Sequence, residues 1–174
     1  MKFKNIFMVG CLFAAGFLTS CERDEPEMKK TEALPLAGEW WVKYEVETSP
    51  GVFEDIYHFG YSAILTSNTA ANTKNEIWVS DEGHFWNYKV KANADADNRT
   101  FSITDAISIA KNSNGTPYDI KVNITDGKVI KDGGRSATGV TTDSIMFNIE
   151  FEDDPGTIYR ASGHKRTGFL EDEF

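Results

Sequence analysis

The sequence predicts an all-β protein: an antiparallel up-and-down meander of about eight strands that closes into a barrel. Apolar and polar side chains alternate with a period of two in several short stretches, which is typical of strands with one buried face. Turn residues separate these stretches, and no long segment after residue 20 has a helical period. Closure removes the exposed edges of a long meander, so a barrel is favoured and a β-sandwich is the alternative.

The clearest alternation lies in residues 39–48 and 143–152, where every second side chain is aromatic, β-branched or another large apolar group. Gly60 interrupts an apolar stretch and indicates a bulge or tight bend. Asp126-Gly127 predicts a hairpin turn. The further expected strands are 56–66, 76–80, 84–91, 100–109, 119–125, 128–131 and 157–168; 93–98 is expected to turn, 132–134 to form a flexible loop and 170–174 a short acidic tail.

The first twenty residues have the pattern of an export signal. Lys2 and Lys4 precede thirteen apolar residues, 6–18, which are too few to span a bilayer as a helix. Residues 18–21, Leu-Thr-Ser-Cys, resemble the lipobox of bacterial lipoproteins, in which the cysteine is acylated and becomes the new N-terminus. We therefore expect residues 1–20 to be cleaved and Cys21 to attach the chain to a membrane.

The rest of the chain is expected to be a tether followed by one domain. Residues 21–34 begin with an acidic, proline-containing run and predict a flexible tether. Residues 35–174 are long enough for a single domain with a real core. A formal charge of -9 argues against nucleic acid as a partner, because phosphate contacts need clustered lysine and arginine. The sequence does not identify a protein partner. The expected location is the outer membrane or cell surface.

The sequence predicts no catalytic residues, no metal site and no cofactor. Residues 60–64, Gly-Tyr-Ser-Ala-Ile, lack the second glycine of a nucleophile elbow. The three histidines, His58, His84 and His164, have no partner at zinc-motif spacing. Residues 93–104 start like a calcium loop but have no glycine at the sixth position and no glutamate at the twelfth. A triad assembled across strands stays possible, because spacing does not reveal it.

Aromatic side chains at expected strand positions are the candidate ligand-binding residues. They predict either a packed core or an apolar pocket inside the barrel. The candidates for the barrel interior are Trp40, Tyr44, Trp78, Trp86, Tyr88, Phe147 and Phe151. The candidates for contacts with a carboxylate or phosphate headgroup are Arg160, Lys165 and Arg166.

Several short motifs together resemble a family of Bacteroidetes lipoproteins, the lipid-binding putative hydrolases. The motifs are Leu-Ala-Gly-Glu-Trp at 36–40, Asn-Thr-Ala-Ala-Asn at 68–72, Glu-Ile-Trp-Val at 76–79, Phe-Trp at 85–86, Asp-Ser-Ile at 143–145 and Gly-His-Lys-Arg-Thr-Gly-Phe at 163–169. The resemblance covers residues 34–172. It implies a calycin-type, lipocalin-like barrel and a lipoprotein location, and it supplies no catalytic residue.

These observations favour a lipid-anchored lipoprotein of the cell envelope that binds a small hydrophobic or amphipathic, lipid-like ligand in its barrel. A hydrolase acting on ester or glycosidic bonds is one alternative. An interaction module of a surface complex is another, with Trp41 and Tyr61 as expected exposed contacts.

Overall fold

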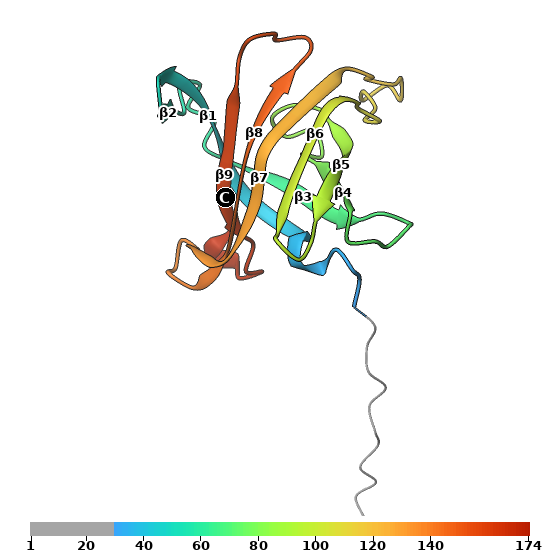
Figure 1. The fold of residues 1–174 in the computed structure, drawn as a ribbon. Coiled ribbons are helices and arrows are strands. Elements are labelled where there is room, and N and C mark those ends of the chain that lie inside the picture. Colours follow the sequence, from blue (N-terminus) through green and yellow to red (C-terminus); the bar gives the residue numbers. More distant parts are fainter. Residues whose placement is uncertain (1–29) are drawn as a thin grey trace, which may run out of the picture.

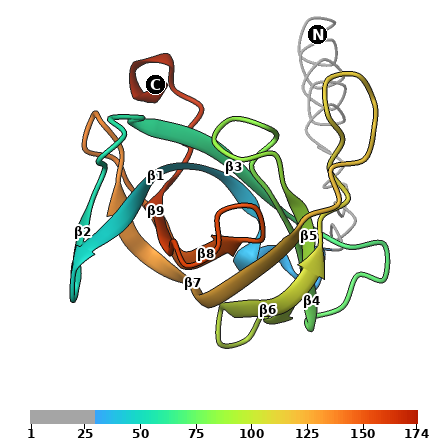
Figure 2. The same ribbon diagram turned by 90° about the horizontal axis from the view of Figure 1, so that it is seen from above.

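A computed structural model describes residues 30–174, and it confirms the predicted fold class. All strands belong to one antiparallel sheet, in which β1 pairs with β3, each strand from β3 onward pairs with the next, and β9 pairs back with β1 (Figures 1 and 2). The sheet therefore closes into a barrel, and the sandwich alternative is wrong. The predicted signal, Cys21 and most of the predicted tether lie outside the described residues.

Eight strands form the barrel wall, and the short strand β2 lies beside one end of β1. The elements are η2 (Leu34–Leu36), β1 (Gly38–Ser49), β2 (Val52–Glu54), β3 (Tyr61–Asn68), β4 (Glu76–Ser80), β5 (Lys89–Asp95), β6 (Thr100–Ile107), β7 (Lys121–Arg135), β8 (Thr141–Phe151), β9 (Tyr159–Lys165) and η3 (Leu170–Asp172). Within these residues, no helix has the length and apolar character needed to cross a membrane.

Closure depends on a close approach between β9 and β1. Gly163 of β9 is paired with Val42, and a Cβ atom built on Gly163 would lie 1.8 Å from the carbonyl oxygen of Trp41. No side chain fits at that distance. The missing side chain of Gly163 therefore lets β1 pair with β3 on one side and β9 on the other.

Large side chains fill the barrel interior. The inward-facing residues of β1, Trp40, Val42 and Tyr44, are at most 1% exposed. Phe147 and Phe151 of β8 are completely buried, as are apolar residues of β4, β5 and β7. Because a side chain beside an empty cavity would still be accessible to a water-sized sphere, these values show that the interior is packed.

The barrel has two different ends. The connections 81–88, 108–120 and 152–158, together with the β1–β3 connection, lie at one end, which we call the mouth; it is at the top of Figure 1. The chain enters at the other end, the tether end, at Lys30. There Trp40 donates a hydrogen bond from Nε1 to Thr66 Oγ1 (2.8 Å), whose hydroxyl donates to the carbonyl of Leu36 in η2 (2.6 Å).

Several local predictions were wrong. Residues 84–88 form a loop, so β5 begins only at Lys89 and includes residues 93–95 that were expected to turn. Asp126-Gly127 is a bulge inside the continuous strand β7, and not a hairpin turn. Asp126 has a left-handed φ of 56°, a conformation that occurs in β-bulges as well as in tight hairpin turns. The predicted flexible loop 132–134 also lies within β7, and residues 56–60 precede β3 without joining it.

We expect the substitution Gly163→Ala to lower the free energy of unfolding by ~3 kcal/mol or more, because the new methyl group overlaps the backbone of β1. Chemical denaturation of the purified chain measures this loss. The control is Ser162→Ala on the same strand, which is expected to change stability by no more than about 0.5 kcal/mol. Equal stability of the Gly163→Ala variant and the unaltered chain would contradict the tight closure.

Candidate functional site

Two aromatic side chains close the mouth, and we call Phe85 and Trp86 the mouth plug. Phe85 stacks on Tyr44 of β1 with a centroid distance of 4.1 Å and an interplanar angle of 11°. Trp86 stacks on Phe151 of β8 at 4.6 Å and 6°. Both side chains are half-buried, and both also contact Tyr159 of β9. The plug therefore joins opposite sides of the wall and covers the core.

The carboxylate of Asp81 shapes the loop that carries the plug. It accepts hydrogen bonds from the backbone N–H groups of Gly83 (2.9 Å), Phe85 (2.9 Å), Trp86 and Tyr88. These N–H groups point toward one buried side chain and cannot join a strand ladder. This is why residues 84–88 of the expected strand 84–91 form a loop, and only the part from Lys89 onward is a strand. Burial raises the pKa of Asp81, although the N–H groups favour its carboxylate form.

Two tyrosine hydroxyls meet in the packed interior. The hydroxyl oxygens of Tyr44 and Tyr88 lie 3.2 Å apart and form a hydrogen bond. Burial raises the pKa of both tyrosines well above the usual value, and the nearby charge of Asp81 raises each pKa further. Both hydroxyls are therefore neutral at physiological pH.

Further exposed apolar side chains lie at the same end of the barrel as the mouth plug, and we call them the mouth rim. Phe59 is 45% exposed and meets Phe85 edge-on at 5.3 Å. The members of the rim are Val52, Ile56, Tyr57, Phe59, Ile107, Ile109 and Ile158. The four connections at this end carry one lysine, Lys111, and each contains acidic residues. The mouth is thus apolar and acidic, which suits an uncharged amphiphile better than an anionic one.

The predicted interior aromatics do not line an open cavity. Trp40, Tyr44, Tyr88, Phe147 and Phe151 point inward as expected, but they form the packed core. Trp86 belongs to the plug. The prediction for Trp78 was wrong: Ile77 and Val79 face the core, so Trp78 lies half-buried on the outer face of β4. Glu76, two residues before Trp78, and Ser80, two residues after it, are polar, so the alternation in residues 76–80 was a usable signal for the outward position of Trp78.

The three predicted headgroup contacts do not converge on the mouth. Arg160 faces outward on β9, where its guanidinium lies 3.3 Å above the ring of Phe53. Lys165 lies near the tether end and donates to the carbonyl of Ala37 (3.0 Å). Arg166 is held by two carboxylates there. The structure therefore does not bring these three cations together beside the mouth plug, and their contact with a ligand headgroup stays a prediction.

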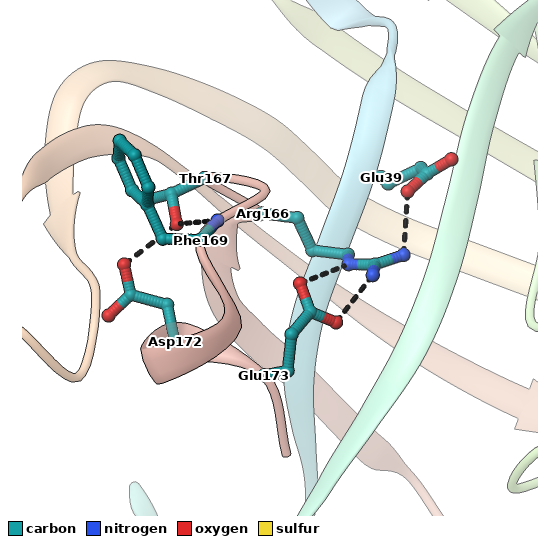
Figure 3. Close-up of polar contacts among 6 residues, drawn as sticks. All are labelled: Glu39, Arg166, Thr167, Phe169, Asp172 and Glu173. Carbon is teal, nitrogen blue, oxygen red and sulfur yellow. Dashed lines mark hydrogen bonds and ion pairs between the residues drawn. The ribbon is translucent and has the colours of Figure 1, made fainter.

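The predicted acidic tail packs against the barrel wall as a strap, which we define as residues 166–174 (Figure 3). Arg166 binds Glu173 through two nitrogens and donates to Glu39 of β1 (2.7 Å). Asp172 is 1% exposed and accepts hydrogen bonds from the N–H of Thr138 and the hydroxyl of Thr167, both at 2.7 Å. Burial opposes ionisation of Asp172, but these hydrogen bonds outweigh it and lower its pKa to about 2.

The strap covers the two aromatics that were expected to be exposed contacts. Phe174 packs on Tyr61 with a centroid distance of 4.1 Å and meets Trp41 edge-on at 5.7 Å. Trp41 is only 9% exposed and Tyr61 is half-buried, so the expectation of free contact residues was wrong. His164 is buried beside them, and burial lowers its pKa, which keeps the ring neutral.

A separate groove of about 690 Å³ lies on the outer face of β5 to β9. Its lining alternates along each strand with core residues; for example, Met146 and Asn148 flank the buried Phe147. Side chains of both charge signs line it, including Asp95, Lys128 and Arg160. A lining with both charge signs does not favour one class of ligand. The barrel wall separates the groove from the mouth plug.

The described residues contain no hydrogen-bonded serine–histidine pair. Ser62 faces the interior and His164 the exterior of the wall, as their pairings with Val42 and Trp41 on β1 require. His84 contacts the carbonyl of Asp81 (2.6 Å). Residues 30–174 also bring no three histidine, cysteine, aspartate or glutamate side chains together in a group able to hold a metal ion.

The mouth rim and the role of Asp81 were missed in the sequence. Phe85-Trp86, one residue after the turn Asp81-Glu82-Gly83, was a usable signal, because adjacent aromatics cannot both face one side of a strand. No local sequence pattern indicates that Phe59 and Ile109 are exposed, because their exposure depends on how the connections pack once the barrel is closed.

Comparison with known proteins agrees with this geometry. The model of a family described as "Lipid-binding putative hydrolase" matches residues 25–170. No curated protein matches the chain. The matched residues include the whole barrel and the loop that carries the plug.

We expect the substitution Asp81→Ala to loosen the mouth plug. Without the carboxylate, several buried N–H groups lose their acceptor, at a cost of ~2 kcal/mol. Hydrogen exchange followed by mass spectrometry should show faster exchange in residues 82–88. The matched control is Asp95→Ala, which removes an exposed aspartate that accepts from the N–H of Asn98 at the other end of the barrel. Unchanged exchange in residues 82–88 would refute the role of Asp81.

Proposed function

Because the chain belongs to the lipid-binding putative hydrolase family, we propose that it is a lipid-anchored protein of the cell envelope that holds one lipid-like molecule at the mouth of its barrel. Cys21 carries the anchor in this proposal, at the outer membrane or cell surface. The observation that supports the ligand site is the half-buried aromatic plug at the same end of the barrel as the exposed apolar side chains of the rim.

The ligand lies across the plug and the rim, because the interior beneath is packed. An acyl chain covering Phe59, Phe85 and Trp86 removes apolar surface from water, worth roughly 25 cal/mol per Å². Deeper entry requires Phe85 to leave its stack on Tyr44. The acidic connections favour a ligand with an uncharged or zwitterionic head, such as an acylglycerol, over a free fatty acid.

We expect the substitution Trp86→Ala to weaken binding of a pyrene-labelled monoacylglycerol by roughly 30-fold, the effect of losing ~2 kcal/mol of aromatic contact. Energy transfer from tryptophan to pyrene measures the binding. The matched control is Trp78→Ala, the same change on the outer wall, which should leave the affinity within about twofold. Equal losses in both variants, or no binding by the unaltered chain, would rule out the mouth as the ligand site.

We expect intact-mass measurement of the chain made in its own cells to show cleavage before Cys21 and the added mass of at least two acyl chains, since one chain anchors only marginally. The variant Cys21→Ser should leave the membrane fraction and keep its barrel fold, as judged by circular dichroism. A mature chain with an unmodified Cys21 would rule out the anchor while leaving the mouth proposal standing.

A further inference from the structure

We propose that the tether end of the barrel rests on the bilayer that holds the acyl anchor, with Phe169 and Leu170 of the strap inserted among the lipid headgroups. This inference rests on the proposed acylation of Cys21. It goes beyond the anchor because it assigns a second contact with the membrane and, with it, a fixed orientation of the barrel.

A second group of exposed apolar side chains lies at the tether end. Leu170 is 87% exposed and Phe169 is 57% exposed, next to each other at the start of η3. Val140, in the β7–β8 connection, is 41% exposed, and Leu34 of η2 is 45% exposed. We call Leu34, Val140, Phe169 and Leu170 the tether-end patch.

The described contacts place the members of this patch at one end. The N–H of Thr138, two residues before Val140, donates to Asp172 in η3. Arg166, which begins the strap, binds Glu39 at the start of β1, only a few residues after Leu34. In Figure 1 the chain enters at this same lower end, beside η2.

The strap holds its apolar residues in place. The Arg166–Glu173 pair fixes its far end, and Asp172 accepts a hydrogen bond from Thr167 (Figure 3). Asp172 also accepts a hydrogen bond from the N–H of Thr138. The N–H of Phe169 also donates to the hydroxyl of Thr167 (3.3 Å). An apolar group already fixed in position loses little conformational entropy when it enters an interface, so the structure favours contact over a free tail.

The length of the connection places this patch near the membrane. From Cys21 to Lys30 the chain has nine residue steps, which reach at most about 32 Å even when fully extended. The tether end is therefore the end of the barrel held closest to the anchor. The mouth rim lies at the opposite end and opens away from that bilayer.

The energetics suit a weak contact that acts together with an anchor. Each methylene buried in lipid contributes about 0.8 kcal/mol, so two side chains alone give only marginal binding. Attachment through Cys21 makes the contact intramolecular, and a marginal interaction is then enough to orient the barrel. The formal charge of -9 disfavours anionic lipids, so the partner is a neutral, zwitterionic bilayer surface.

A single-cysteine design tests the contact. The chain has only two cysteines; Cys11 lies in the segment expected to be cleaved, and acylated Cys21 is blocked. The variants Leu170→Cys and Ile107→Cys each add one free thiol at a highly exposed aliphatic position, the first on the patch and the second on the mouth rim. Each acylated chain is spin-labelled and placed in phosphatidylcholine vesicles, and its collisions with oxygen and with a water-soluble nickel chelate are measured.

We expect the label at position 170 to collide several-fold more with oxygen, relative to the nickel chelate, than the label at position 107. Similar, water-like ratios at both positions would overturn the inference, as would lipid contact at position 107 alone. A label at 170 shielded from both reagents would show a protein contact instead and would also overturn it. Intact mass separates these results from an absence of acylation, which would contradict the proposed anchor itself.

Discussion

The whole architecture depends on the pairing between the first and last strands. Gly163 allows β9 to approach β1 so closely that no side chain fits between its Cα and the Trp41 carbonyl. Once the sheet is closed, alternate residues of every strand share one interior, and its volume is fixed by the strand number. In this barrel, aromatic side chains together with isoleucine, valine and leucine side chains fill that volume. Because the interior is filled, the candidate contact sites for a ligand or a membrane lie at the ends of the barrel and not at its centre.

Both ends are closed, but by different means. At the tether end, Trp40, Thr66 and Leu36 form a chain of hydrogen bonds that joins the wall to η2. At the mouth, Phe85 and Trp86 close the interior by stacking, and one buried carboxylate shapes their loop. Stacked rings tolerate more change in geometry than hydrogen bonds do. Replacing the contacts that close the barrel by contacts with an apolar ligand therefore costs less free energy at the mouth than at the tether end.

The sequence was sufficient for the fold because strand alternation is a local property. Residues 39–48 and 143–152 became β1 and β8 with nearly the predicted bounds. The sequence was insufficient where contacts with other residues, and not local propensity, determine the backbone conformation. Asp81 draws four N–H groups out of the sheet, and Asp126-Gly127 adopts in a bulge the same left-handed geometry that a hairpin requires. Neither outcome follows from propensity.

Side-chain placement was harder to predict than strand position. Trp78 was placed among the interior aromatics, and Trp41 was taken as exposed because its own strand places it outward. The first error neglects the period of two, which puts Trp78 on the same face as Glu76 and Ser80. The second arises because a segment more than 120 residues later, ending in Phe174, folds back over the wall. Arg166 depends on the same segment, since its guanidinium is bound to Glu173 as well as to Glu39.

The two apolar surfaces therefore have different physical characters and different proposed partners. The mouth rim lies at the end where stacked rings cover the core, so a single acyl chain can exchange contacts with these rings. The most exposed members of the tether-end patch, Phe169 and Leu170, sit on a strap that is fixed by ion pairs and buried hydrogen bonds and presents their side chains outward. A barrel held at its tether end directs the mouth away from the anchoring bilayer. A ligand then reaches the mouth from the aqueous side or from another surface. It does not pass directly into the mouth from the bilayer that holds the anchor.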